Sequence, residues 1–323
     1  MRSLRWAGLL ALYIGAQAVG LALAEPFRSA GLASTSNPQS PTAPFVFIAV
    51  IVAAPIAILL LARRKGGVTA LRHLILVAIA GALYFTLYST LALVVFTTPY
   101  LPPPYAAELL VDPALIVAAS ASALIYLALL IEPQWYVVDL AGFLAAGSLV
   151  AILGISFAIL PAFILLGALM VYDAIAVYRT KHMVSLADVV TEMKLPILMV
   201  MPDRAGYDYT AAPSYGEQRG QPTEERAAMF MGLGDVVIPG TLVVSAFVWL
   251  PATPEWLGIG AGLLVAIGVL VGSLVGYAVL MRVLRSGNPQ AGLPFLNGGA
   301  LAGYLLSYVL VFHSFSFGLG GAL

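Results

Sequence analysis

Two aspartates lie inside hydrophobic segments of this chain, where a charged side chain is costly. Asp173 ends the run Leu169-Met170-Val171-Tyr172-Asp173, and Asp235 ends the run Gly232-Leu233-Gly234-Asp235. An ionisable residue that persists inside a membrane segment usually has a function. Two neighbouring carboxyl groups cannot both ionise cheaply, so one would hold a proton while the other takes a proton from water. The pair could therefore carry out general acid–base chemistry with an activated water.

The composition indicates that membrane helices must position these aspartates. Of the 323 residues, 61% are hydrophobic and only 9% are charged. A soluble domain of this length would expose too much apolar surface, so the class is a polytopic membrane protein. The chain has no cysteine, which excludes disulfides, thiolate metal sites and a cysteine nucleophile.

Segment lengths predict the fold. About 20 apolar residues cross the roughly 30 Å hydrocarbon core as a helix. This criterion predicts an all-α polytopic membrane protein with nine transmembrane helices, forming a single membrane domain over residues 1–323. The predicted helices are 4–24, 44–62, 71–96, 106–131, 134–153, 156–178, 229–250, 257–284 and 294–315, with the fifth and sixth joined at Gly154-Ile155.

The first segment could also be a signal peptide. Arg2 and Arg5 precede an apolar run that ends in Ala22-Leu23-Ala24, a small-residue pattern typical of a cleavage site. The run is nevertheless longer than the usual signal-peptide core of about 7–15 residues. We therefore expect it to be retained as a helix, and the rest of the topology is the same either way.

Basic residues orient the predicted bundle. With alternating crossings, only Arg28 falls on one side of the membrane. The other fourteen of the fifteen fall on the opposite side: Arg2, Arg5, Arg63, Arg64, Lys65, Arg72, Arg179, Lys181, Lys194, Arg204, Arg219, Arg226, Arg282 and Arg285. The positive-inside rule then predicts a cytoplasmic N-terminus and an external C-terminus.

This topology places the two aspartates at matching depth. Asp173 lies six residues before Arg179, which is about 9 Å of helix, and Asp235 lies nine residues after Arg226, about 13 Å. Consecutive helices are often neighbours, so the carboxyl groups could face each other near the cytoplasmic side. The alternative is that each aspartate only hydrogen-bonds a neighbouring helix, which the matched depth makes a weaker interpretation.

The flanking residues are typical of a site where chains approach closely. Gly232 and Gly234 leave the backbone before Asp235 bare, and Tyr172 adds a hydroxyl and a rigid ring beside Asp173. Pro294 suits a helix start, whose positive end would face the two carboxyl groups.

Together these residues carry a resemblance. The chain resembles the presenilin and signal peptide peptidase family of intramembrane aspartyl proteases, whose patterns are YD, GxGD and PAL. The matching residues are Tyr172-Asp173, Gly232-Leu233-Gly234-Asp235 and Pro294-Phe295-Leu296, on the sixth, seventh and ninth predicted helices. The resemblance implies that Asp173 and Asp235 are the catalytic pair, with Tyr172, Gly232, Leu233, Gly234, Pro294, Phe295 and Leu296 supporting the active site. Phe295 replaces the usual alanine, and we expect its ring to narrow the substrate groove.

The resemblance also implies the substrate and the role of the long loop. We expect a multi-pass protein of the cell membrane that cleaves transmembrane proteins or peptides within the lipid bilayer, without metal, cofactor or nucleic acid. Residues 179–228 are predicted to form a cytoplasmic, partly disordered loop. In this loop Leu195, Ile197 and Leu198 belong to a strand-like stretch that could pair with an unwound substrate.

Other functions remain as alternatives. An ion or proton-coupled transporter also uses buried aspartates, although we find no inverted repeat. A prepilin-peptidase-like enzyme shares GxGD but has fewer helices. The sequence has no H-E-x-x-H and no Gly-x-Ser-x-Gly, which disfavours zinc proteases and serine hydrolases. Asp112 and Asp139 are predicted to be interfacial or packing residues.

Overall fold

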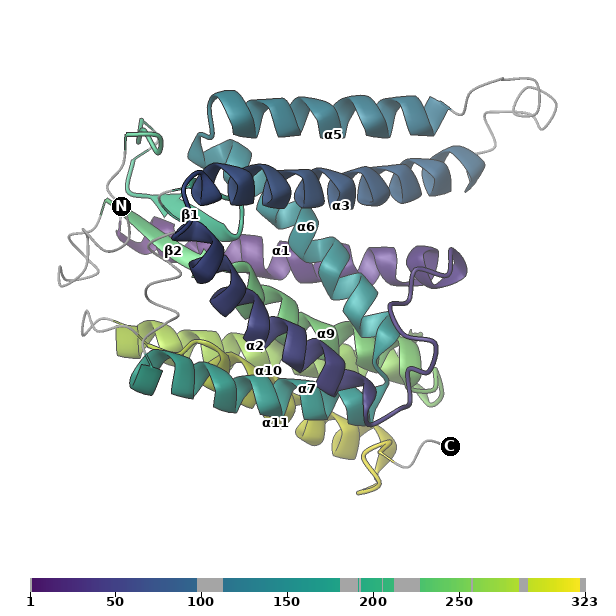
Figure 1. The fold of residues 1–323 in the computed structure, drawn as a ribbon. Coiled ribbons are helices and arrows are strands. Elements are labelled where there is room, and N and C mark those ends of the chain that lie inside the picture. The colour runs from purple at the N-terminus through teal and green to yellow at the C-terminus, as the bar shows by residue number, and fades with distance from the viewer. Residues whose placement is uncertain are drawn as a thin grey trace.

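A computed structural model describes residues 2–97, 113–180, 191, 193–204, 206–211, 227–256, 258–284 and 290–319. Over these residues the chain is a helical bundle (Figure 1). Its α-helices are α1 (Arg2–Ser29), α2 (Ala43–Ala62), α3 (Gly67–Thr97), α5 (Pro113–Ile131), α6 (Trp135–Ser156), α7 (Ile159–Ile175), α9 (Leu233–Trp249), α10 (Ala261–Leu284) and α11 (Leu293–Phe312). In the described part of the chain, eight of these helices are long and apolar enough to cross a membrane, and α9 is shorter.

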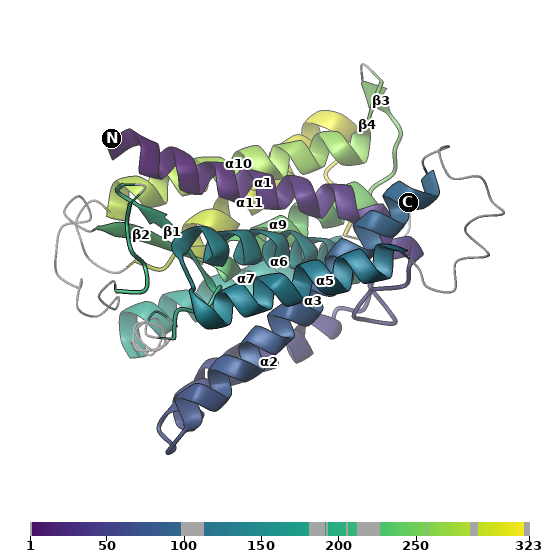
Figure 2. The ribbon, with the colours of Figure 1, turned by 90° about the horizontal axis from the view of Figure 1, so that it is seen from above.

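Two small antiparallel sheets interrupt the helical pattern. Strand β1 (Leu198–Pro202) pairs with β2 (Ala228–Gly232), and β3 (Glu255–Trp256) pairs with β4 (Ile259–Gly260). Figure 2 shows the two sheets at opposite ends of the bundle. The first sheet is the one that bears on the aspartates, because β2 runs directly into α9.

The start of the seventh helix differs from the prediction. The predicted helix 229–250 begins only at Leu233, because residues 228–232 form β2. Hydropathy does not distinguish a short apolar strand from the end of an apolar helix. The strand is stabilised by pairing with residues about 30 positions earlier, and Gly232 is a poor helix former.

The boundary between the fifth and sixth predicted helices also moves. Helix α6 continues through Ser156, and the turn falls at Phe157 and Ala158, both extended. Pro161 lies in the first turn of α7, where a missing N–H costs no helical hydrogen bond. After Ile175 the chain continues as a π-helix over Ala176–Thr180, so the helix widens just after Asp173.

Helix α9 is at the centre of the bundle. It contacts α1, α6, α7, α10 and α11, and nearly all its residues are buried. Small residues permit this packing: Gly240 lies against Val150 of α6, and Gly154 of α6 lies against Val244. The surrounding helices therefore fix the position of Asp235 in the first turn of α9.

Long-range contacts define the two ends of the bundle. At one end Arg5 of α1 forms an ion pair with Asp203, just after β1, at 3.4 Å. At the other end Ser34, after α1, donates through its backbone N–H to the Ser156 hydroxyl at 2.7 Å. Helix α1 begins beside the β1–β2 sheet and α11 ends at the opposite end (Figure 1).

Candidate active site

Asp173 lies near the C-terminal end of α7 and is buried, with 8% of its surface exposed. Its Oδ2 accepts a hydrogen bond from the backbone N–H of Leu293, the first residue of α11, at 3.0 Å. The segment that precedes α11 therefore approaches the carboxyl group directly.

Asp235 lies in the first turn of α9 and is partly exposed. A Cβ atom on Gly292 would lie 2.7 Å from its Oδ1, and one on Gly232 would lie 3.4 Å from its Oδ2. The carboxyl group thus lies between two bare stretches of backbone, one from the end of β2 and one from the residue before α11.

The two carboxyl groups meet at the same dipeptide. Leu293 donates to Asp173 while the adjacent Gly292 contacts Asp235. These contacts bring together residues that are 62 and 57 positions apart in sequence. The arrangement has the elements of an acid–base pair: two neighbouring carboxyl groups, one buried and one partly exposed.

The other residues predicted around the aspartates lie in α7, at the junction of β2 with α9, and in the first turn of α11. Tyr172 is half-buried beside Asp173, and Gly232 ends β2. Leu233 is buried, whereas Gly234 is exposed and a Cβ there would meet nothing within 4 Å. Pro294, Phe295 and Leu296 form the first turn of α11, where Leu296 is fully buried and Phe295 packs against the core.

The loop residues predicted to pair with substrate belong to the sheet or precede it. Leu195 is fully buried, and the carbonyl of Ile197 accepts a hydrogen bond from the Leu233 N–H at 3.0 Å. Leu198 begins β1 opposite Gly232. This stretch therefore already pairs with the chain that leads into Asp235. The rest of the predicted loop, residues 181–190, 192, 205 and 212–226, lies outside the described residues.

Several residues of the site were not singled out from the sequence. The phenol of Tyr178 donates to Oε1 of Gln290 at 2.8 Å, which connects the π-helix after Asp173 to the chain before Gly292. Asn297 donates from Nδ2 to the carbonyl of Leu166 at 3.0 Å, which ties α11 to α7. The Pro-Phe-Leu motif indicates this region of the chain. It does not predict which backbone N–H or which glycine contacts the carboxyl groups, because such contacts do not depend on residue type.

Asp139 has the second of its two predicted roles, that of a packing residue. It is buried in α6, and its Oδ1 accepts the backbone N–H of Val200 at 2.6 Å. Tyr209, in the loop beyond the spanning helices, is buried nearby, and that burial, then Tyr207 and Asp139, raises the pKa of its phenol. Asp112, the other predicted interfacial residue, lies outside the described residues.

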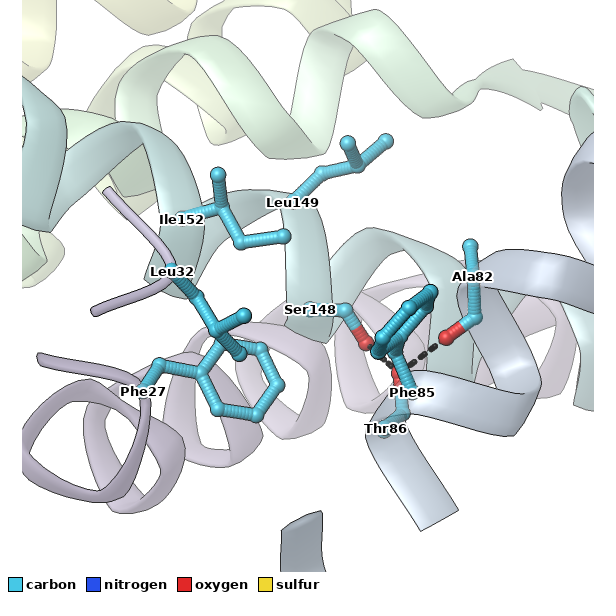
Figure 3. Close-up of a pocket in the computed structure, with 8 residues that line it drawn as sticks. All are labelled: Phe27, Leu32, Ala82, Phe85, Thr86, Ser148, Leu149 and Ile152. Carbon is cyan, nitrogen blue, oxygen red and sulfur yellow. Dashed lines mark hydrogen bonds between the residues drawn. The ribbon is translucent and has the colours of Figure 1, made fainter. Parts of the chain in front are cut away.

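A pocket of about 170 Å³ lies at a distance from this site, between α1, α3 and α6 (Figure 3). Its lining is apolar except for Thr86 and Ser148, which hydrogen-bond each other. The lining residues are Phe27, Leu32, Ala82, Phe85, Thr86, Ser148, Leu149 and Ile152. None of them contributes to the carboxyl pair.

Comparisons with known proteins agree with this geometry. The family model described as signal-peptide peptidase, presenilin aspartyl protease matches residues 10–313. Two solved structures, each described as a presenilin family intramembrane aspartate protease, are similar over 94% of this chain. One is 29% identical with a TM-score of 0.64 over 99% of its own chain, and the other is 33% identical with a TM-score of 0.60 over 97%. No curated protein matches.

Proposed function

Because the chain belongs to the signal-peptide peptidase and presenilin family of aspartyl proteases, we propose that Asp173 and Asp235 are its catalytic dyad. Membership makes the chain an intramembrane-cleaving aspartic endopeptidase, the enzyme class predicted from the sequence, and does not favour a transporter. The observation that carries the dyad assignment is the Gly292–Leu293 segment, which contacts both carboxyl groups.

The chemistry follows from sharing one proton between the two carboxyl groups. The ionised member takes a proton from a water molecule, whose oxygen attacks the peptide carbonyl carbon. The protonated member donates to the carbonyl oxygen and stabilises the charge that develops there. When the C–N bond of the tetrahedral intermediate breaks, the leaving nitrogen receives a proton from the dyad. No metal is needed for these steps.

The substrate is proposed to be a transmembrane helix that unwinds before it is cut. A helix in lipid satisfies its own backbone groups, so an unwound stretch needs new hydrogen-bond partners. An added strand on the β1–β2 sheet would supply them. The sequence alone points to the β1 stretch, but β2 is the better edge, because β1 packs against α6 whereas β2 leads directly to Asp235.

Cleavage of a model transmembrane substrate by the purified protein tests the dyad. We expect Asp173→Ala and Asp235→Ala each to lower activity on the order of 10³-fold or more, and the double variant to be no worse, because the residues act as a unit. Activity of the wild type should follow a bell-shaped pH profile. Only the pair with one proton supplies both an acid and a base, and that state disappears when both groups are protonated or both are ionised.

Asp208→Ala is the matched control, because Asp208 is an exposed carboxylate in the loop. It should retain wild-type cleavage. Substantial peptidase activity in either dyad variant, with cleavage at the wild-type bond, would show that the assignment is wrong.

A further inference from the structure

Asp139 is a buried carboxyl group that the dyad chemistry does not use. It lies in α6 with 5% of its surface exposed, and its Oδ1 accepts the Val200 N–H at 2.6 Å. Its Oδ2 has no hydrogen-bond partner within the described residues. A carboxyl group is costly to bury in a membrane helix, so its one strong bond to a strand backbone needs a functional explanation.

The position of this bond in the sheet follows from the strand register. The Asp203 N–H donates to the Ala227 carbonyl, and the Leu233 N–H donates to the Ile197 carbonyl. Odd-numbered residues on both strands therefore bond across the β1–β2 ladder, and even-numbered residues direct their backbone groups to the outer edges. Val200 is even-numbered, so Asp139 holds β1 by the edge that faces α6.

That edge is closed in a second way as well. Pro202, the next even-numbered residue toward the loop, has no N–H to offer. A covering helix, an inward-pointing charge and a proline are devices that prevent a foreign strand from pairing at an edge. The β1 side of the sheet is thus attached to α6, and the β2 side remains the one that leads to Asp235.

From these contacts we propose that Asp139 is a positioning residue that fixes the β1–β2 sheet to α6 and so determines which substrate bond reaches Asp235. The path is short: Asp139 holds Val200 in β1, Ile197 before β1 holds Leu233, and Asp235 follows two residues later. If β1 shifts along α6, the sheet and a strand added to it move relative to the dyad. This inference rests on the proposed function, because it presumes that substrate joins the sheet.

Two substitutions separate the hydrogen bond from the charge. Asp139→Leu removes the acceptor with a side chain of similar length, and Asp139→Asn keeps an acceptor oxygen but no charge. We expect Asp139→Leu to spread cleavage over neighbouring bonds, so that the share of product cut at the main bond falls about twofold or more, while kcat falls about tenfold and KM changes little. Asp139→Asn should restore the wild-type product pattern. Mass spectrometry of the products and initial rates measure these effects.

Ser148→Ala controls for a general loss of packing in the same helix. Ser148 is also buried in α6 and hydrogen-bonds Thr86, at the pocket distant from the sheet (Figure 3). This variant should keep the wild-type cleavage positions, whatever its thermal stability. An unchanged product pattern in Asp139→Leu, or a spread pattern in both Asp139→Asn and Ser148→Ala, would overturn the inference. The proposed function would survive either result, and only inactive wild-type protein or active dyad variants would contradict it.

Discussion

At Gly292 the chain passes the Asp235 carboxyl group at a distance that leaves no space for a side chain. A Cβ atom would lie 2.7 Å from Oδ1 and 3.0 Å from Cγ. The neighbouring Leu293 N–H bonds Asp173, so a displacement of this dipeptide would alter both carboxyl groups together. The glycine therefore sets the separation of the α11 entry from the dyad.

Gly292→Ala tests this close approach. The added methyl group must push the α11 entry or Asp235 aside, and a misplacement of about 1 Å can cost about a hundredfold in rate. We expect cleavage of a model substrate to fall about 10- to 100-fold with a nearly unchanged melting temperature in detergent.

Gly298→Ala is the matched control six residues further along, because a Cβ there would meet nothing within 4 Å. It should keep full activity. Equal cleavage rates for Gly292→Ala and Gly298→Ala would show that the close approach of Gly292 to Asp235 is not needed for activity.

At this scale the sequence predicts charged residues better than their partners. Asp173 and Asp235 stand out because a carboxylate in an apolar run is locally visible. The Leu293 N–H and the Gly292 contact are not visible, since they depend on where α11 enters the bundle. Asp139 is likewise an aspartate within an apolar segment, so the sequence does not separate it from the dyad. Its hydrogen bond with Val200 is what distinguishes its role.

At the scale of elements, the β1–β2 sheet connects the loop to α9. Its ladder is formed by the odd-numbered residues, so Met199 pairs across it with Met231, whereas Leu198 directs its N–H to the other edge. Substitutions at two adjacent positions of β1 therefore affect opposite edges of the strand.

Proline substitution distinguishes the two sides of β1. Met199→Pro removes an N–H from the β1–β2 ladder, and should destabilise the protein by about 1–2 kcal/mol more than Leu198→Pro. Because the ladder positions α9, cleavage should also fall further in Met199→Pro. Thermal unfolding in detergent and cleavage rates measure the difference. Greater damage from Leu198→Pro would reverse the deduced register.

The sheet also shows why hydropathy predicts helices better than strands here. Long apolar runs reveal the spanning helices, and eight of them have the length to cross a membrane among the described residues. The sequence predicts a helix where β2 lies, because the five residues of β2 are apolar and its partner strand is distant in sequence. Close contacts of Gly272 with Gly299 and Gly303, which join α10 to α11, were equally beyond reach of a single sequence.

On the scale of the whole molecule, the confirmed prediction is a helical membrane protein of the presenilin type, whereas the count of nine crossings and the orientation stay predictions. The contacts at the two ends are consistent with alternating crossings. Arg5 and Arg72 both bond at the end that carries the β1–β2 sheet, Arg5 to Asp203 and Arg72 to the carbonyls that end α5.

Reporter fusions test the orientation. A reporter after Leu323 should lie outside the cell and one inserted within residues 206–220 should lie inside, because fourteen of the fifteen basic residues fall on the predicted cytoplasmic side. Protease protection or a compartment-specific enzyme reporter gives the answer. With a cytoplasmic N-terminus, a cytoplasmic C-terminus would require an even number of crossings and would contradict the predicted nine.

The short central helix has a consequence for how water reaches the carboxyl groups. Helix α9 has 17 residues and is about 25 Å long, less than the roughly 30 Å of hydrocarbon that a spanning helix must match. Because α1, α6, α7, α10 and α11 surround α9, its shortfall lies inside the protein and not against lipid. The missing turn is at the Asp235 end, where β2 replaces it, and non-helical backbone at such a place is buried in protein or lines a water-filled cavity. We therefore expect water to approach Asp235 from the sheet end of the bundle, over a shorter path than a full-length helix would leave.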